Sequence, residues 1–117
     1  MRKKRAMREL VTIQTLTTTV DAVGQRVPTF KTNSDLFRIP AHVEHIAGAE
    51  TFRGHQLEAG VVAVFEMRNA DVSAMDQLTH VTGKNKAYGI TSVRPVEGKF
   101  EGGFKWMYVF VKAVADG

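Results

Sequence analysis

The clearest pattern of apolar and polar positions lies near the end of the chain, at residues 104–113. Aromatic and β-branched side chains dominate this run, which favours a strand over a helix. With a period of two, one face would carry Phe104, Trp106, Tyr108 and Phe110, and the other face would carry Lys105, Met107, Val109, Val111 and Ala113. A strand that is apolar on both faces needs cover on both. We therefore expect one face to line a core and the other to meet a local flap or another subunit.

The same alternation predicts further strands, separated by turn signals. They lie at residues 9–20, 26–31, 36–46, 61–68, 75–81 and 86–94. Gly24 supplies the positive φ that a tight reversal needs, and Pro28 places the first hairpin at a sheet edge because proline cannot donate to a ladder. Pro40 predicts a bend in its strand, and Pro95 is expected to end the strand before it. Four side chains of the third strand should share one face: Phe37, Ile39, Ala41 and Val43.

Residues 47–60 lose the period of two, and three glycines in them break any long helix. We expect a short helix or a long loop here, mobile in the free subunit and ordered in an assembly. Phe52 should anchor this segment, either as a core aromatic or as an interface side chain. The sum is an all-β protein: a small barrel or sandwich of six or seven strands with this one insertion. Residues 1–8 would be a basic flexible segment and residues 9–114 a single domain.

Composition narrows the classes of function. The 117 residues include no cysteine, which excludes disulfides and thiolate metal sites, and no apolar run approaches the length of a membrane span. Sixteen Lys and Arg face twelve Asp and Glu, and without five of these cations the remainder is slightly acidic. Those five are Arg2, Lys3, Lys4, Arg5 and Arg8. They are candidates for contact with DNA in a channel, because Lys and Arg displace counterions from phosphates; the alternative is a solvated tail.

Candidate chemistry is sparse. Of the four histidines, His42, His45, His55 and His80, the first two could form a metal site with Glu44 and Glu50 only if these side chains converged, so exposed or edge-packed histidines are expected. No serine has a local base partner, and the glycine-rich stretch 97–103 belongs to a hairpin rather than to a phosphate loop. The aromatic residues around Trp106 could stack on single-stranded nucleic acid, but core packing is the simpler interpretation. We therefore expect no enzyme activity and no cofactor.

The order of the segments resembles the small head–tail joining proteins of tailed bacteriophages, also called head-closure or stopper proteins. The resemblance rests on the opening strand at residues 8–14, the hairpin formed by 21–25 and 27–30, the strand at 37–44 and the Gly-x-Glu at 48–50. Asp76, Leu78, Tyr88, Ile90 and Val93 continue it. Phe37 stands where the family usually has tryptophan, and the loop at 97–103 looks longer than usual.

The resemblance implies a structural virion component with a small β-barrel. Such proteins form a ring in the neck, close the portal channel after DNA packaging and give the tail its docking surface. Implied partners are copies of the chain itself in a ring matching the twelvefold portal, an adaptor or portal ring, tail terminator or tail-tube proteins, and packaged DNA, with no membrane. The protein would be made in the host cytoplasm. Candidate inter-subunit or gating residues are Glu50, Phe52, Arg53, His55 and Leu57, and a second contact loop contains Lys99 and Phe100.

Two alternatives stay open. One is a tail-completion protein of the neck, which would cap the tail tube rather than the head. The other is a small β-barrel that binds nucleic acid through the basic tail and exposed aromatic side chains.

Overall fold

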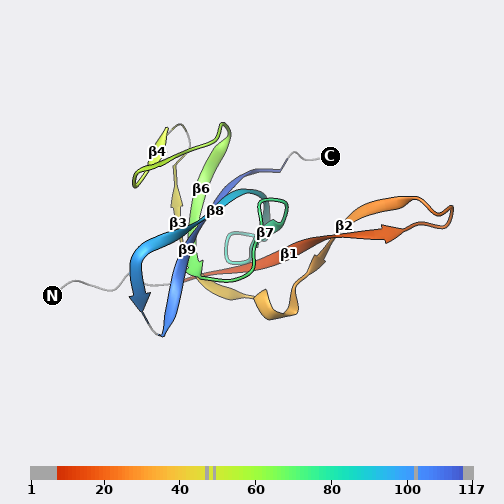
Figure 1. The fold of residues 1–117 in the computed structure, drawn as a ribbon, viewed down its shortest axis with the longest axis horizontal. Coiled ribbons are helices and arrows are strands. Elements are labelled where there is room, and N and C mark those ends of the chain that lie inside the picture. The colour runs from red at the N-terminus through yellow and green to blue at the C-terminus, as the bar shows by residue number, and fades with distance from the viewer. Residues whose placement is uncertain (1–7, 47, 49, 102, 115–117) are drawn as a thin grey trace.

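A computed structural model describes residues 8–46, 48, 50–101 and 103–114, and within it the side chains of Glu97, Lys99, Phe100, Glu101 and Phe104 lie outside the description. The regular secondary structure is almost entirely strand (Figure 1). The elements are β1 (Glu9–Val20), β2 (Arg26–Thr32), a 3-10 turn η1 (Ser34–Leu36), β3 (Ile39–His45), β4 (Thr51–Phe52), β5 (His55–Gln56), β6 (Val61–Arg68), β7 (Gln77–His80), β8 (Lys86–Glu101) and β9 (Phe104–Ala113). No helix in these ranges has the length and apolar character needed to cross a membrane.

Seven antiparallel strands form one sheet in the order β2-β1-β3-β6-β9-β8-β7, and a further pairing of β1 with β7 curls that sheet into a partly closed barrel. β1 closes the barrel because its first half has neighbours on both edges. Glu9–Val11 pair with β3, and Val11–Gln14 pair with β7. The all-β barrel predicted from the sequence is confirmed.

Beyond Gln14, β1 leaves the barrel and pairs only with β2. The two strands form a two-stranded ribbon that projects well to the right of the barrel in Figure 1 and accounts for the longest dimension of the molecule, 61 Å against 32 and 26 Å. We call residues 15–31 the arm. Its tip is a tight turn with Gly24 at a φ of 84°, and the carboxylate of Asp21 accepts hydrogen bonds from two amides of that turn.

The core sits inside the barrel and confirms the expected two-faced character of β9. Met107, Val109 and Val111 are at most 1% exposed and pack in the barrel interior with residues such as Phe65. Tyr108 and Phe110 point to the opposite side and are also buried, in a second and smaller cluster. Full burial of one such apolar side chain stabilises the fold by about 1.5–3 kcal/mol.

The second cluster exists because residues 50–60 fold over the outer face of β6 and β9. Of the two forms expected for this insertion, the structure has the long loop, and at its centre β4 and β5 make a two-residue hairpin. Arg53 and Gly54 form the reversal with φ values of 47° and 84°. Two successive positive φ values are the signature of a type I′ turn, whose twist matches that of the flanking strands. We call residues 50–57 the flap.

The face predicted for the third strand does not include Phe37. Phe37 is 57% exposed, whereas Ile39 and Ala41 are buried. Arg38 has a φ of 52°, so the chain reverses there and the alternation of β3 begins only at Ile39. Leu36, in η1, is buried in place of Phe37.

The predicted end of β8 at Pro95 is also wrong. β8 continues to Glu101, and Pro95 stands opposite Met107 of β9, next to a register irregularity. Past Gly89, β8 has left β7 and pairs only with β9. A proline is tolerated there because the missing N–H can face the open edge, where no ladder bond is lost.

Candidate functional site

The basic N-terminal candidates lie mostly beyond what the structure describes. Arg2, Lys3, Lys4 and Arg5 are outside the described residues, and Arg8 is exposed directly before β1. Lys99 and Phe100 lie in β8, but their side chains are outside the description as well. Their predicted contacts with DNA and with neighbouring subunits remain predictions.

Four of the five flap candidates come together, while Glu50 is exposed. Phe52 lies at their centre. Its side chain is 8% exposed, and its ring lies edge-on to the rings of Tyr108 and Phe110, with centroid distances of 5.2 and 6.0 Å. His55 makes similar edge-on contacts with the same two rings at 6.2 and 6.0 Å, and Leu57 packs against the cluster. Aromatic pairs in this geometry contribute about 0.5–1.5 kcal/mol each beyond area burial. Phe52 is therefore packed within its own subunit.

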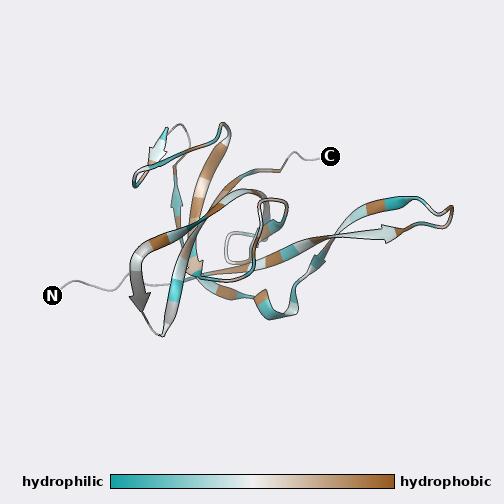
Figure 2. Ribbon diagram, in the orientation of Figure 1, coloured by the Kyte–Doolittle hydropathy of each residue, from teal (hydrophilic) through white to brown (hydrophobic). Residues whose placement is uncertain are grey.

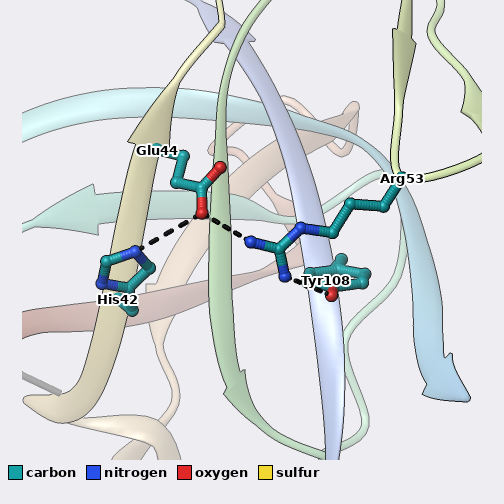
Figure 3. A network of polar contacts seen from close by, with 4 residues as sticks. All are labelled: His42, Glu44, Arg53 and Tyr108. Carbon is teal, nitrogen blue, oxygen red and sulfur yellow. Dashed lines mark hydrogen bonds and ion pairs between the residues drawn. The ribbon is translucent and has the colours of Figure 1, made fainter. Parts of the chain in front are cut away.

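Arg53 fixes the flap to the barrel through polar contacts (Figure 3). Its Nη1 donates to Oη of Tyr108 at 2.8 Å, and its Nη2 donates to Oε1 of Glu44 at 2.8 Å. The guanidinium carbon also lies 5.0 Å from the centre of the Phe52 ring and 5.6 Å from that of Tyr108. His42 stands on the other side of Glu44, with Nε2 3.6 Å from the same carboxylate oxygen. Two sets of contacts therefore hold the flap on the barrel. We call the packing of Phe52 the anchor and the contacts of Arg53 with Glu44 and Tyr108 the clamp.

Burial works against the charge of Arg53, yet the pKa of its guanidinium is raised. The hydrogen bond with Tyr108 and the charges of Glu44 and Glu66 favour the protonated form more than desolvation disfavours it. The same contacts offset the backbone cost of placing a side chain with a Cβ at positive φ, which is about 1–2 kcal/mol. Arg53 is exposed enough that the ion pair with Glu44 alone contributes modestly.

A second polar group ties the two ends of the barrel sheet together at the β1–β7 seam. His80 is 6% exposed, which contradicts the expectation of an exposed or edge-packed histidine. Its Nε2 lies 2.7 Å from Oε1 of Glu9, and the hydroxyl of Thr82 donates to the same oxygen at 3.1 Å. These two hydrogen bonds, that of His80 first, lower the pKa of Glu9. A Cβ on Gly83 would come within 2.2 Å of the His80 ring, so only glycine fits there.

Sequence reasoning missed this seam because Glu9 and His80, which meet there, are 71 positions apart in the sequence. Its local signals, a glycine after His80 and a carboxylate at the start of β1, are common elsewhere in the chain. Among the residues with described placement, no three His, Asp or Glu side chains gather as ligands for a metal ion. The contacts of Glu9 with His80 and Thr82 join the start of β1 to the end of β7.

The exposed apolar surface of the molecule is concentrated on and around the arm. Figure 2 shows apolar positions along the ribbon and at its tip, away from the barrel. Seven large apolar side chains are exposed in the described part of the chain: Val20, Val23, Val27, Phe30, Phe37, Met75 and Val114. Four belong to the arm. A two-stranded ribbon is marginally stable alone in water, so an apolar one that projects this far is a candidate contact surface.

Comparison with known proteins points to one family. A family model described as phage head completion protein matches residues 3–114. The solution structure of protein SF1141 from Shigella flexneri 2a is similar in fold, with a TM-score of 0.69 and 20% sequence identity over 96% of each chain. Among curated proteins, none matches this chain by sequence.

Proposed function

Since the chain belongs to the phage head completion protein family, we propose that it forms a ring at the head–tail interface, closes the portal channel after DNA packaging and provides the surface to which the tail attaches. The family match covers nearly the whole chain, so the protein is a phage structural component that acts in completion of the head. The ring, the closure and the attachment surface are the finer parts of the proposal.

The observation that supports the ring most strongly is the arm. A subunit of a closed ring uses two different surfaces, because each copy contacts one neighbour on each side. The two apolar clusters of the barrel lie inside it and under the flap, whereas the arm leaves Val20, Val23 and Phe30 at 67, 80 and 44% exposure. Such a projection on a protein of this family suits contact with another subunit.

The proposed partners follow from position in the neck. Copies of the chain would match the twelvefold portal, with an adaptor or portal ring on the head side and tail terminator or tail-tube proteins on the tail side. The basic segment with Arg2, Lys3, Lys4, Arg5 and Arg8 would contact packaged DNA, since five cations in eight residues favour phosphate. The protein would be made in the host cytoplasm and would have a structural rather than a catalytic role.

Loss of the gene from the phage tests this function. We expect heads that package DNA and then lose it, together with free, complete tails, and we expect both defects to be rescued by the wild-type gene in trans. Stable DNA-filled heads accompanied by defective tails would instead indicate the tail-completion protein. Normal infectious particles would contradict both roles.

A further inference from the structure

The two faces of the arm differ in chemistry. In an antiparallel pair, residues directly opposite each other share a face. One face carries the opposed pairs Leu16–Phe30, Thr18–Pro28 and Val20–Arg26. The other carries Thr15–Lys31, Thr17–Thr29 and Thr19–Val27. We call the first the apolar face and the second the threonine face.

The hydroxyl groups of the threonine face form hydrogen bonds within the arm. The hydroxyl of Thr17 donates to the carbonyl of Thr29 at 3.1 Å, and the hydroxyls of Thr19 and Thr29 are also 3.1 Å apart. The apolar face has no such internal partners. It exposes Val20 and Phe30, and the main charge on it is the single cation Arg26. A surface of this kind fits a protein partner better than a phosphate backbone, which is contacted mainly by several cations.

The edges of the arm and of β8 are poorly suited to strand addition. Pro28 lies in the middle of β2, and Pro95 lies on the stretch of β8 that pairs only with β9 and leaves its other edge open. Prolines on open edges blunt pairing with another chain. Contact through the arm should therefore use its apolar face rather than backbone hydrogen bonds.

The same chain carries a complementary surface where the arm leaves the barrel. Residues 33–37 are held to one edge of β1 by hydrogen bonds from the Asn33 amide to the Ile13 carbonyl and from the Arg38 amide to the Thr12 hydroxyl. Residues 69–75 lead into Asp76, whose carboxylate accepts the amide of Leu16 at 3.2 Å on the other edge. We call these two segments the arm root.

The arm root is apolar and acidic. It exposes Phe37 by 57% and Met75 by 67%, and it carries exposed Asp35 and Asp71 with no basic residue inside either segment. On the arm, Arg26 lies on the apolar face, Lys31 lies on the threonine face, and Asp21 is the one acid, with its carboxylate turned to the amides of the tip turn. The apolar face of the arm, with Arg26, and the root, with Asp35 and Asp71, are therefore complementary in apolar character and in charge. The six arm residues 15–20 add roughly 20 Å to β1, so the tip reaches away from its own root.

We infer that the apolar face of the arm of one copy packs against the arm root of the next copy. The occupant is a second copy because donor and acceptor surfaces are present once on every chain, and a contact between two different surfaces propagates into a ring when its rotation closes. Val20 and Phe30 lie over Phe37 and Met75 of the neighbour, and Arg26 faces the acids Asp35 and Asp71. This inference rests on the proposed ring and names the surfaces through which its subunits meet.

Site-specific photo-crosslinking tests the contact, because the chain contains no cysteine and accepts a single thiol cleanly. A benzophenone maleimide is attached to Val20→Cys, on the apolar face, and in a matched control to Val27→Cys, on the threonine face of the same ribbon. Both positions are exposed, so folding should be unaffected, and circular dichroism checks this. Samples of the full chain from about 10 µM to about 1 mM are irradiated, and the adducts are mapped by mass spectrometry.

We expect a ladder of dimers, trimers and larger species from position 20, with adducts in residues 33–37 and 69–75. The probe at position 27 should give about tenfold fewer crosslinked species. Arg26→Glu should reduce crosslinking about tenfold, and Asp71→Arg in the same chain should restore part of it. A ladder whose adducts map to other surfaces would contradict this interface, although the subunits could still form a ring through those surfaces. Dimers alone, equal yields from both positions, or no ladder even at the highest concentration contradict the inference. The particle phenotype described above tests the proposed function separately.

Discussion

Replacement of Phe52 by alanine separates the stability of the flap from that of the barrel. In a fully fixed structure, the change would remove a side chain that is 8% exposed and two edge-on ring contacts, at a cost of about 3–5 kcal/mol. The flap can avoid most of this cost by detaching. The loss of global stability then cannot exceed the free energy of opening the flap in the wild-type protein.

That opening free energy is small. Phe52 and the contacts of Arg53 contribute about 3–4 kcal/mol together, and ordering of the flap backbone offsets much of it. We therefore expect Phe52→Ala to lower the global free energy of unfolding by only about 1–2 kcal/mol in urea titrations. Hydrogen exchange should meanwhile show nearly complete loss of protection at the Leu57 amide, which donates to the Glu50 carbonyl at 3.0 Å. Amides of β6 and β9 should lose protection only in proportion to global stability.

Phe37→Ala is the matched control, because Phe37 is 57% exposed and its loss should change stability by less than about 0.5 kcal/mol. The reasoning is refuted if Phe52→Ala costs the full 3–5 kcal/mol and the flap loses no more protection than the barrel. In wild type, the same experiment addresses the mobility that its length and glycines predict for residues 47–60. The anchor and clamp make measurable protection of the flap in the free subunit the expected result.

Three other changes probe the clamp and the seam. Arg53→Lys should reduce flap protection about tenfold in hydrogen exchange, because an ammonium group cannot reproduce the planar fork between Glu44 and Tyr108; unchanged protection would rule out the clamp. The lowered pKa of Glu9 stabilises the fold above the ordinary glutamate pKa of about 4.3, and this contribution is lost as pH falls through the lower folded value. In urea titrations at pH 3–6, the free energy of unfolding should therefore fall less steeply with decreasing pH for Glu9→Gln than for wild type. Equal slopes would contradict a stabilising role of the Glu9 carboxylate. Gly83→Ala should destabilise the chain by about 1–3 kcal/mol, because its Cβ would overlap the His80 ring; a loss under about 0.5 kcal/mol in the same titrations would show that the ring moves aside freely.

Strands with a strict period of two were predictable to the residue. The bounds of β1 and β9 agree with the alternation, and both faces of β9 are buried as its two apolar faces required. Local alternation was sufficient here because it reflects burial directly. It was insufficient wherever the backbone turned unexpectedly. Phe37 falls outside the core because Arg38 has a positive φ. The residues around Arg38 form no pattern that predicts this backbone conformation.

Other features depended on distant neighbours or on unusual turn chemistry. Pro95 does not end β8, because β7 has already separated from that edge. His80 is buried because Glu9, far away in sequence, lies across the seam from it. The flap hairpin was missed because its type I′ turn has Arg-Gly in place of the usual Asn-Gly. The exposure of the arm followed from register, since only the structure shows where β7 and β3 stop and leave β1 uncovered.

The most direct test of the head-completion role is a reconstruction by electron cryomicroscopy of the neck of the virion in which this chain is found. We predict a ring of small β-barrels between the portal and the tail, twelve in number, with the arm of each subunit lying on its neighbour. A neck reconstructed at side-chain resolution that contains no copy of this barrel would contradict the account.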